Sequence, residues 1–149
     1  MALHKDFPEV GGMPAYDLIV GTILEHYPTA QAIYLFGTYG TPSERPDSDV
    51  DIAVLLPHEL ARQNPRLMLT PCHYALADAL ERSVDLLNAR EISTVFQKEI
   101  VETGRPVFCA DDEALAAFEM LTLSHYQKLN EERKEIIEAF EATGKAYAV

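Results

Sequence analysis

The chain has 149 residues, 48% of them apolar, which is enough for one domain with a buried core. Its net charge of −12 leaves no basic patch to meet phosphates, so direct binding of DNA or RNA is not expected. It contains no run of 18 apolar residues and no apolar leader, so we expect a cytoplasmic protein that does not enter a membrane. Cys72 and Cys109 lie outside any metal-ligand spacing and are expected as core residues in a reducing compartment.

Hydrophobic periodicity and turn residues predict alternating helices and strands after a loose arm over 1–12. The expected helices cover 14–27, 65–80, 92–103 and 111–143, with a polar link beginning at 57. The expected strands cover 32–36, 50–56, 83–87 and 105–109. This alternation implies an α/β (α+β) domain whose small, mostly buried sheet is flanked by helices. We expect a single domain over 1–149, with its core at about 14–109.

Two carboxylates stand at the start of the second expected strand. Asp49 and Asp51 are separated by one residue, so on a strand both side chains point to the same face. Mg²⁺ usually meets one or two protein carboxylates together with substrate phosphates, and this pair supplies them. The alternative is a turn in which the aspartates cap loop amides. That alternative explains Asp51 poorly, because five apolar residues follow it and a carboxylate at the mouth of a buried strand is costly.

A glycine turn, Gly37-Thr38, follows the first expected strand. Gly37 allows a sharp bend and a close ligand, backbone N–H groups can cradle phosphate, and the Thr38 hydroxyl can donate to a phosphate oxygen. Taken alone, the pair is weak evidence, and an ordinary turn is the favoured interpretation because Gly is the commonest turn residue. Tyr39, next along, is either a base-stacking aromatic or a plain loop residue.

Asp85 is the candidate for a third carboxylate, because it too is an acid inside an apolar strand. If that strand lies beside the one that carries Asp51, Asp85 can ligate a second ion or accept a proton from the acceptor hydroxyl. Strand alternation alone leaves a solvent-facing position equally possible.

Together, Gly37-Thr38, a ten-residue spacer and Asp49-Val50-Asp51 resemble the motif of the polymerase-β-like nucleotidyltransferases. The size, the spacer and Asp85 resemble the minimal nucleotidyltransferase (MNT) antitoxins of HEPN–MNT toxin–antitoxin pairs. The resemblance implies a mixed sheet flanked by helices, with Mg²⁺ as cofactor and ATP as substrate. It further implies a partner, a HEPN ribonuclease toxin, that is silenced when the antitoxin transfers AMP to one of its tyrosines.

The resemblance also implies roles for individual residues. Gly37 and Thr38 fall on the nucleotide-binding pair, and Asp49, Asp51 and Asp85 fall on the catalytic, metal-binding carboxylates. Thr38 replaces the usual Ser and keeps its hydroxyl. Pro42 stands where a Gly is often found, which stiffens the loop and removes an amide donor.

The last expected helix is amphipathic and would span roughly 45 Å, more than so small a sheet can cover. Its second half either reaches a partner or folds back after a break near Asn130. Two functions remain open: a Mg-dependent protein adenylyltransferase that modifies its toxin, and a non-catalytic antitoxin that inhibits the toxin by direct binding. The altered loop favours the second. A transferase acting on a small molecule or on RNA ends fits the acidic charge less well.

Overall fold

The structure, a computed structural model, describes residues 15–143. The expected arm, the expected helix start at Pro14 and the expected stop at Gly144 lie outside this range. The helices are α1 (Tyr16–His26), α2 (His58–Gln63), α3 (Pro71–Leu80), α4 (Thr94–Thr103) and α5 (Asp112–Thr143). The strands are β1 (Ala32–Phe36), β2 (Val50–Leu55), β3 (Val84–Asn88) and β4 (Arg105–Cys109).

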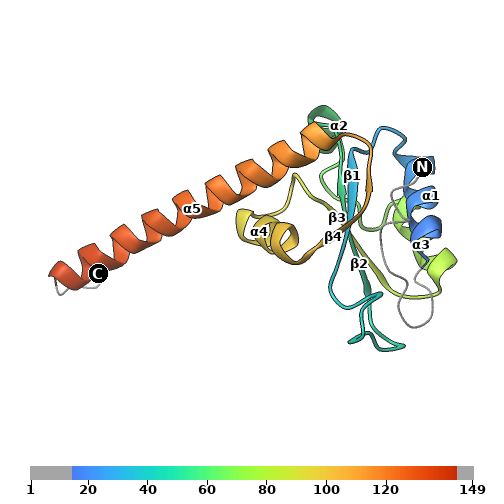
Figure 1. The fold of residues 1–149 in the computed structure, drawn as a ribbon, viewed down its shortest axis with the longest axis horizontal. Coiled ribbons are helices and arrows are strands. Elements are labelled where there is room, and N and C mark those ends of the chain that lie inside the picture. The colour runs from blue at the N-terminus through green and yellow to red at the C-terminus, as the bar shows by residue number, and fades with distance from the viewer. Residues whose placement is uncertain (1–14, 144–149) are drawn as a thin grey trace.

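The strands form one mixed sheet in the order β3-β2-β1-β4, with β2 and β3 parallel and the other pairs antiparallel. Helices cover both faces (Figure 1). On one face, α1 and α3 pack on the side chains around Ile33, Ile52 and Leu86. On the other face, Ile100 of α4 and Phe118 of α5 pack against side chains that include Tyr34 and Leu55. The expected fold class is therefore confirmed.

Strand alternation assigns the carboxylates to a face. The β2 side chains at Ala53 and Leu55 belong to the cluster under α4 and α5. Side chains two positions apart share a face, so Asp51 points to the same side. The candidate site therefore opens on the side of the sheet from which α5 extends.

One expected element was wrong. The polar link after 57 is in fact helix α2, and the helix expected from Pro65 begins only at Pro71. Leu69 has a left-handed φ of 64°, which breaks any helix there. Thr70 then caps α3 by accepting a hydrogen bond from the His73 N–H (3.3 Å), and Pro71 takes the first helical turn.

The other boundaries agree with expectation to within one or two residues. Ser93 caps α4, and Asp111 caps α5 by accepting from the Ala114 N–H at 3.0 Å. Cys72 is buried and Cys109 half-buried, both as free thiols.

Helix α5 has 32 residues and continues through Asn130 without a break, so the alternative in which it folds back is wrong. At 1.5 Å per residue it is roughly 48 Å long. Figure 1 shows its first half against the sheet and α4, and its second half extending away from the domain. Every described residue from 131 to 143 is exposed. Among the described residues, no helix is both long and apolar enough to cross a membrane.

Candidate functional site

The structure brings the three predicted carboxylates to one end of the sheet. Asp51 is the second residue of β2 and lies in register with Phe36 on one side and Asp85 on the other. Asp49 precedes the strand and is exposed, whereas Asp51 and Asp85 are partly buried. Parallel pairing of β2 with β3 is what places Asp51 and Asp85 on the same face. The prediction that the third carboxylate would lie beside the pair is thus correct in its geometry.

Negative charge is concentrated around Asp51. Burial, followed by repulsion from Asp85 and Asp49, raises the pKa of Asp51 to about 6. Within residues 15–143, no basic side chain forms an ion pair with any of the three carboxylates. Proximity of like charges without a cation is unfavourable, and a bound divalent ion would relieve it.

The turn after β1 is shaped around the same carboxylate. Gly37 has φ +72°, and a Cβ built on it would lie 2.2 Å from Asp51 Oδ2. A side chain at this position would therefore occupy the space of the Asp51 carboxylate. Thr38 follows on the exposed side of the turn, where its hydroxyl is open to a ligand. The glycine and the aspartate, though far apart in the sequence, form one structural unit.

The carboxylates suit Mg²⁺ as donors, since they are hard oxygen ligands on one rigid strand pair. Within the described residues, no group of three or more His, Cys, Asp or Glu side chains is already gathered closely enough to enclose a metal ion. The three carboxylates therefore do not enclose an ion by themselves. An ion held by Asp49 and Asp51 would complete its coordination with water and substrate phosphates, as Mg²⁺ commonly does.

Sequence reasoning missed two arginines that hold the loop between β1 and β2. The first is Arg105, at the start of β4. Its guanidinium donates to the carbonyl of Tyr39 at 2.6 Å and to that of Gly37 at 3.4 Å. Its Nε is buried without a hydrogen-bond partner among the described residues. Arg105 therefore holds the turn by its backbone carbonyls. Its cation lies next to Gly37, where we expect the phosphates to bind.

The second is Arg82, just before β3. It donates to the carbonyls of Arg45 (2.9 Å) and Ser48 (2.8 Å), and it pairs with Glu44. Its guanidinium also lies 5.0 Å from the Tyr39 ring centroid.

Further hydrogen bonds join the loop between β1 and β2 to itself and to the segment before α1. Glu44 accepts from the Gly40 N–H at 3.0 Å, and the Tyr39 hydroxyl accepts from the Ala15 N–H at 3.0 Å. Tyr39 is buried, as a plain loop aromatic would be. No sequence motif flagged either arginine, because each acts on loop carbonyls distant along the chain.

We expect Gly37→Ala to separate activity from folding. The left-handed φ costs a non-glycine residue about 1–2 kcal/mol, and the new methyl displaces the Asp51 carboxylate. A misplacement of about 1 Å at a reacting centre lowers the rate roughly 100-fold. Thermal unfolding and a transfer assay measure the two effects.

Gly21→Ala in α1 is the matched control. A Cβ there meets nothing within 4 Å, so the change should stabilise the helix by roughly 0.5–1 kcal/mol and leave activity unchanged. Full activity in Gly37→Ala would mean that the Asp51 carboxylate has no required position.

The comparisons with known proteins agree with this arrangement of a glycine turn and strand carboxylates. The family model described as polymerase beta, nucleotidyltransferase matches residues 20–113, more than half of the chain. The chain belongs to this nucleotidyltransferase family. The matched range contains the turn, all four strands and the three carboxylates.

Relatives within the nucleotidyltransferase family are informative. Protein adenylyltransferase MntA of Shewanella oneidensis is 35% identical over 122 residues, which cover 80% of this chain and 83% of that protein. A chain in the crystal structure of a toxin–antitoxin with AMP-PNP matches with a TM-score of 0.66 at 32% identity, covering 85% of this chain and 98% of that chain.

A chain in the structure of a tri-AMPylated Shewanella oneidensis HEPN toxin in complex with MNT antitoxin matches with a TM-score of 0.62 at 32% identity. It covers 85% of this chain and 95% of that chain. The resemblance to the MNT antitoxins is confirmed.

Proposed function

We propose that this nucleotidyltransferase is a cytoplasmic antitoxin that transfers AMP from ATP to a tyrosine of a HEPN-type toxin and thereby neutralises it. The observation that carries the proposal is the juxtaposition of Asp49, Asp51 and Asp85 beside the Gly37-Thr38 turn. The relatives support the acceptor, because one is named a protein adenylyltransferase and another structure pairs an MNT antitoxin with a tri-AMPylated HEPN toxin.

The chemistry is an in-line displacement at the α-phosphorus of ATP. A bond forms between the tyrosine oxygen and the α-phosphorus, the bond from that phosphorus to the bridging oxygen breaks, and pyrophosphate leaves with the electron pair. Asp85 receives the tyrosine proton. Asp49 and Asp51 would hold Mg²⁺, and the ion would supply electrostatic stabilisation of the charge that develops during the displacement. The Gly37-Thr38 turn binds the phosphates, and Arg105 keeps that turn in place.

The partner surface follows from where the site opens. The carboxylates and α5 lie on the same side of the sheet, so a toxin that contacts α5 can bring its tyrosine to Asp51. Ile136 and Ile137 are 56% and 54% exposed, which provides apolar contact area. The net charge of −12 favours a partner with a basic surface.

The decisive experiment uses the full chain together with a HEPN-type toxin, taken from the neighbouring reading frame if that frame encodes one. After incubation with ATP and Mg²⁺, intact-mass analysis should find the partner heavier by one or more AMP groups. Peptide mapping should place the added groups on tyrosine. An unmodified partner that still binds tightly would instead support the non-catalytic antitoxin. The feature that favours this alternative is Pro42, which lies in the loop and removes one possible amide donor.

The role of Thr38 can be tested by removing only its hydroxyl. We expect Thr38→Val to weaken ATP binding roughly ten-fold, because one hydrogen bond to a charged phosphate is lost. Thr38→Ser keeps the hydroxyl and should bind at least as tightly as the parent. Calorimetry on the three proteins measures this, and three equal affinities would remove Thr38 from the nucleotide site.

Asp85 should act on rate more than on binding. As proton acceptor or third metal ligand it is needed in the transition state, so Asp85→Asn should lower kcat roughly 100-fold or more with little change in the KM for ATP. Asp78→Asn, an exposed carboxylate on α3, is the control. An unchanged kcat in Asp85→Asn would make Asp85 a structural residue.

A further inference from the structure

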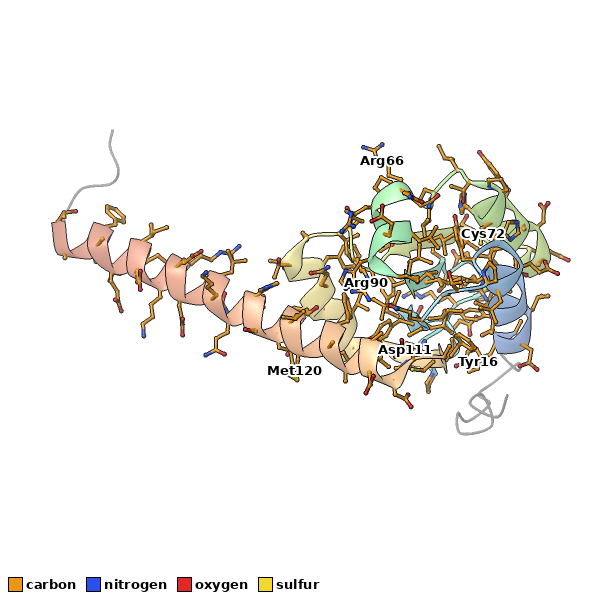
Figure 2. All side chains as sticks on the ribbon, turned by 90° about the horizontal axis from the view of Figure 1, so that it is seen from above. Tyr16, Arg66, Cys72, Arg90, Asp111 and Met120 are labelled. Carbon is orange, nitrogen blue, oxygen red and sulfur yellow. The ribbon has the colours of Figure 1, made fainter. Side chains whose placement is uncertain are left out.

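A pocket lies far from the carboxylates. It is a cavity of about 240 Å³ between α2, the segment after β3, α4 and α5, with Arg62, Arg90, Thr122 and His125 among its lining residues. Arg90 follows the end of β3 and bonds to Leu56, after the end of β2. Asp51 and Asp85 stand at the beginnings of those strands. The pocket is therefore at the opposite end of the sheet from the nucleotidyl transfer site. Figure 2 labels Arg90 close to α2 and α4.

Arg90 is a fixed cation without a counter-ion. Its Nε donates to the Leu56 carbonyl at 2.5 Å and its Nη2 to Gln31 Oε1 at 2.7 Å. Its guanidinium lies 5.9 Å from the Phe118 ring centroid. Within residues 15–143, no carboxylate forms an ion pair with it. Burial lowers the pKa of Arg90. The N–H groups of Arg90 Nη1 make no hydrogen bond within the described residues, so they are available to a ligand in the pocket that Arg90 lines.

Thr122 gives independent evidence. It is 2% exposed and lines the pocket, yet its hydroxyl has no hydrogen-bond partner among the described residues. The hydroxyl is not fully enclosed, because Arg105 Nε is the one buried side-chain polar atom without a partner among the described residues. Since Thr122 lines the cavity, its unused donor is accessible from the pocket. A ligand oxygen in the pocket would satisfy it. The imidazoles of His58 and His125 add two further possible donors around the same space.

We propose that this pocket binds a small phosphate-type oxyanion, at a site separate from the one that uses ATP. The lining offers N–H and O–H donors from several elements, which match the acceptor oxygens of such an anion. Drug-sized ligands occupy pockets of about 300–1,000 Å³, so this cavity suits orthophosphate, pyrophosphate or the phosphate of a nucleoside monophosphate. Glu91 on the lining and Glu59, which pairs with Arg62, reduce the positive charge. We therefore expect affinity in roughly the millimolar range.

The test is an NMR titration of the full chain with pyrophosphate, orthophosphate and AMP, in EDTA to suppress metal-dependent binding at the carboxylates. Chloride at equal ionic strength is the reference. Saturable shifts centred on Thr122 and Arg90 would support the proposal. Comparing the affinity for AMP with the affinities for orthophosphate and pyrophosphate shows which source of phosphate the pocket prefers. Shifts confined to Gly37 and Thr38, or no saturation, would overturn it.

Thr122→Val adds a second measurement. Removing the hydroxyl should weaken pyrophosphate binding at least roughly ten-fold. Thr103→Val makes the same change on α4 outside the pocket, so it should leave binding unchanged. Adenylyl transfer should be unaffected in Thr122→Val, which keeps this test independent of the proposed function. Unchanged pyrophosphate binding in a folded Thr122→Val protein would contradict the proposal.

Discussion

Replacing both Asp49 and Asp51 by Asn should abolish adenylyl transfer while leaving the fold and the partner complex intact. The amides keep the shape of the side chains but lose the charge that would hold Mg²⁺. Metal stabilisation of the transition state is worth several kcal/mol, so we expect a loss of at least roughly a thousand-fold. Intact-mass analysis of the toxin measures it. Asp47→Asn, at an exposed loop position two residues earlier, is the matched control. Substantial transfer by the double variant would refute the catalytic assignment.

The single variant Asp51→Asn should also make the ligand-free protein more stable. Because the folded-state pKa is raised from 3.8 to about 6, the unfavourable contribution of this carboxylate is absent below the ordinary pKa, grows as pH rises from 3.8 to 6, and is complete above 6. The variant should exceed the parent in stability at pH 7–8 by about 1 kcal/mol, less than full linkage gives because the group is partly open to solvent. Below about pH 3 the difference should vanish. Denaturant unfolding at several pH values measures this difference. Equal stability of variant and parent at pH 8 would show that burial and charge repulsion do not destabilise the ionised Asp51.

Removing residues 130–149 should disrupt the toxin complex while leaving the domain folded. The deletion takes away exposed apolar side chains, including Ile137, and none of the described residues that it removes, 130–143, belongs to the buried core. Loss of an apolar contact centre weakens an interface by 2 kcal/mol or more, so we expect at least a roughly 30-fold lower affinity. Co-purification and titration with the toxin measure the affinity, and thermal unfolding checks the domain.

A point variant sharpens this result. Ile137→Glu keeps the helix and should reproduce most of the loss, whereas Glu135→Gln, two residues away and also exposed, should change little. Tight co-purification of both the truncated chain and Ile137→Glu would place the toxin contact elsewhere on the molecule.

The sequence predicted the strands well because each is a short apolar run bounded by turn residues. It predicted the carboxylate site because Asp51 and Asp85 interrupt such runs at positions where a charge has no structural use. It failed between 57 and 70, where an expected link is helix α2 and the first residues of the helix expected over 65–80 are a bend at Leu69, so that α3 begins only at Pro71. The bend depends on Leu67 and Ala61 packing into the core, which no local pattern encodes.

The two arginines that anchor the loop between β1 and β2 could not be predicted from the sequence, for a related reason. Arg82 and Arg105 look like ordinary surface charges between elements, and their partners are backbone carbonyls with no residue signature. The pocket around Arg90 was missed likewise, since its donors come from four separate segments. Contacts of this kind become visible only once the sheet order is known.

The anchoring of the loop between β1 and β2 has a consequence for a chain still being synthesised. The ribosome releases Gly37, Asp49 and Asp51 early, but the two anchors, Arg82 and Arg105, come later, and Arg105 belongs to the last strand of the sheet. A partial chain therefore carries Asp49 and Asp51, the proposed metal ligands, before the Gly37-Thr38 turn is fixed in place. Competence for nucleotide transfer arises late in translation, when β4 pairs with β1.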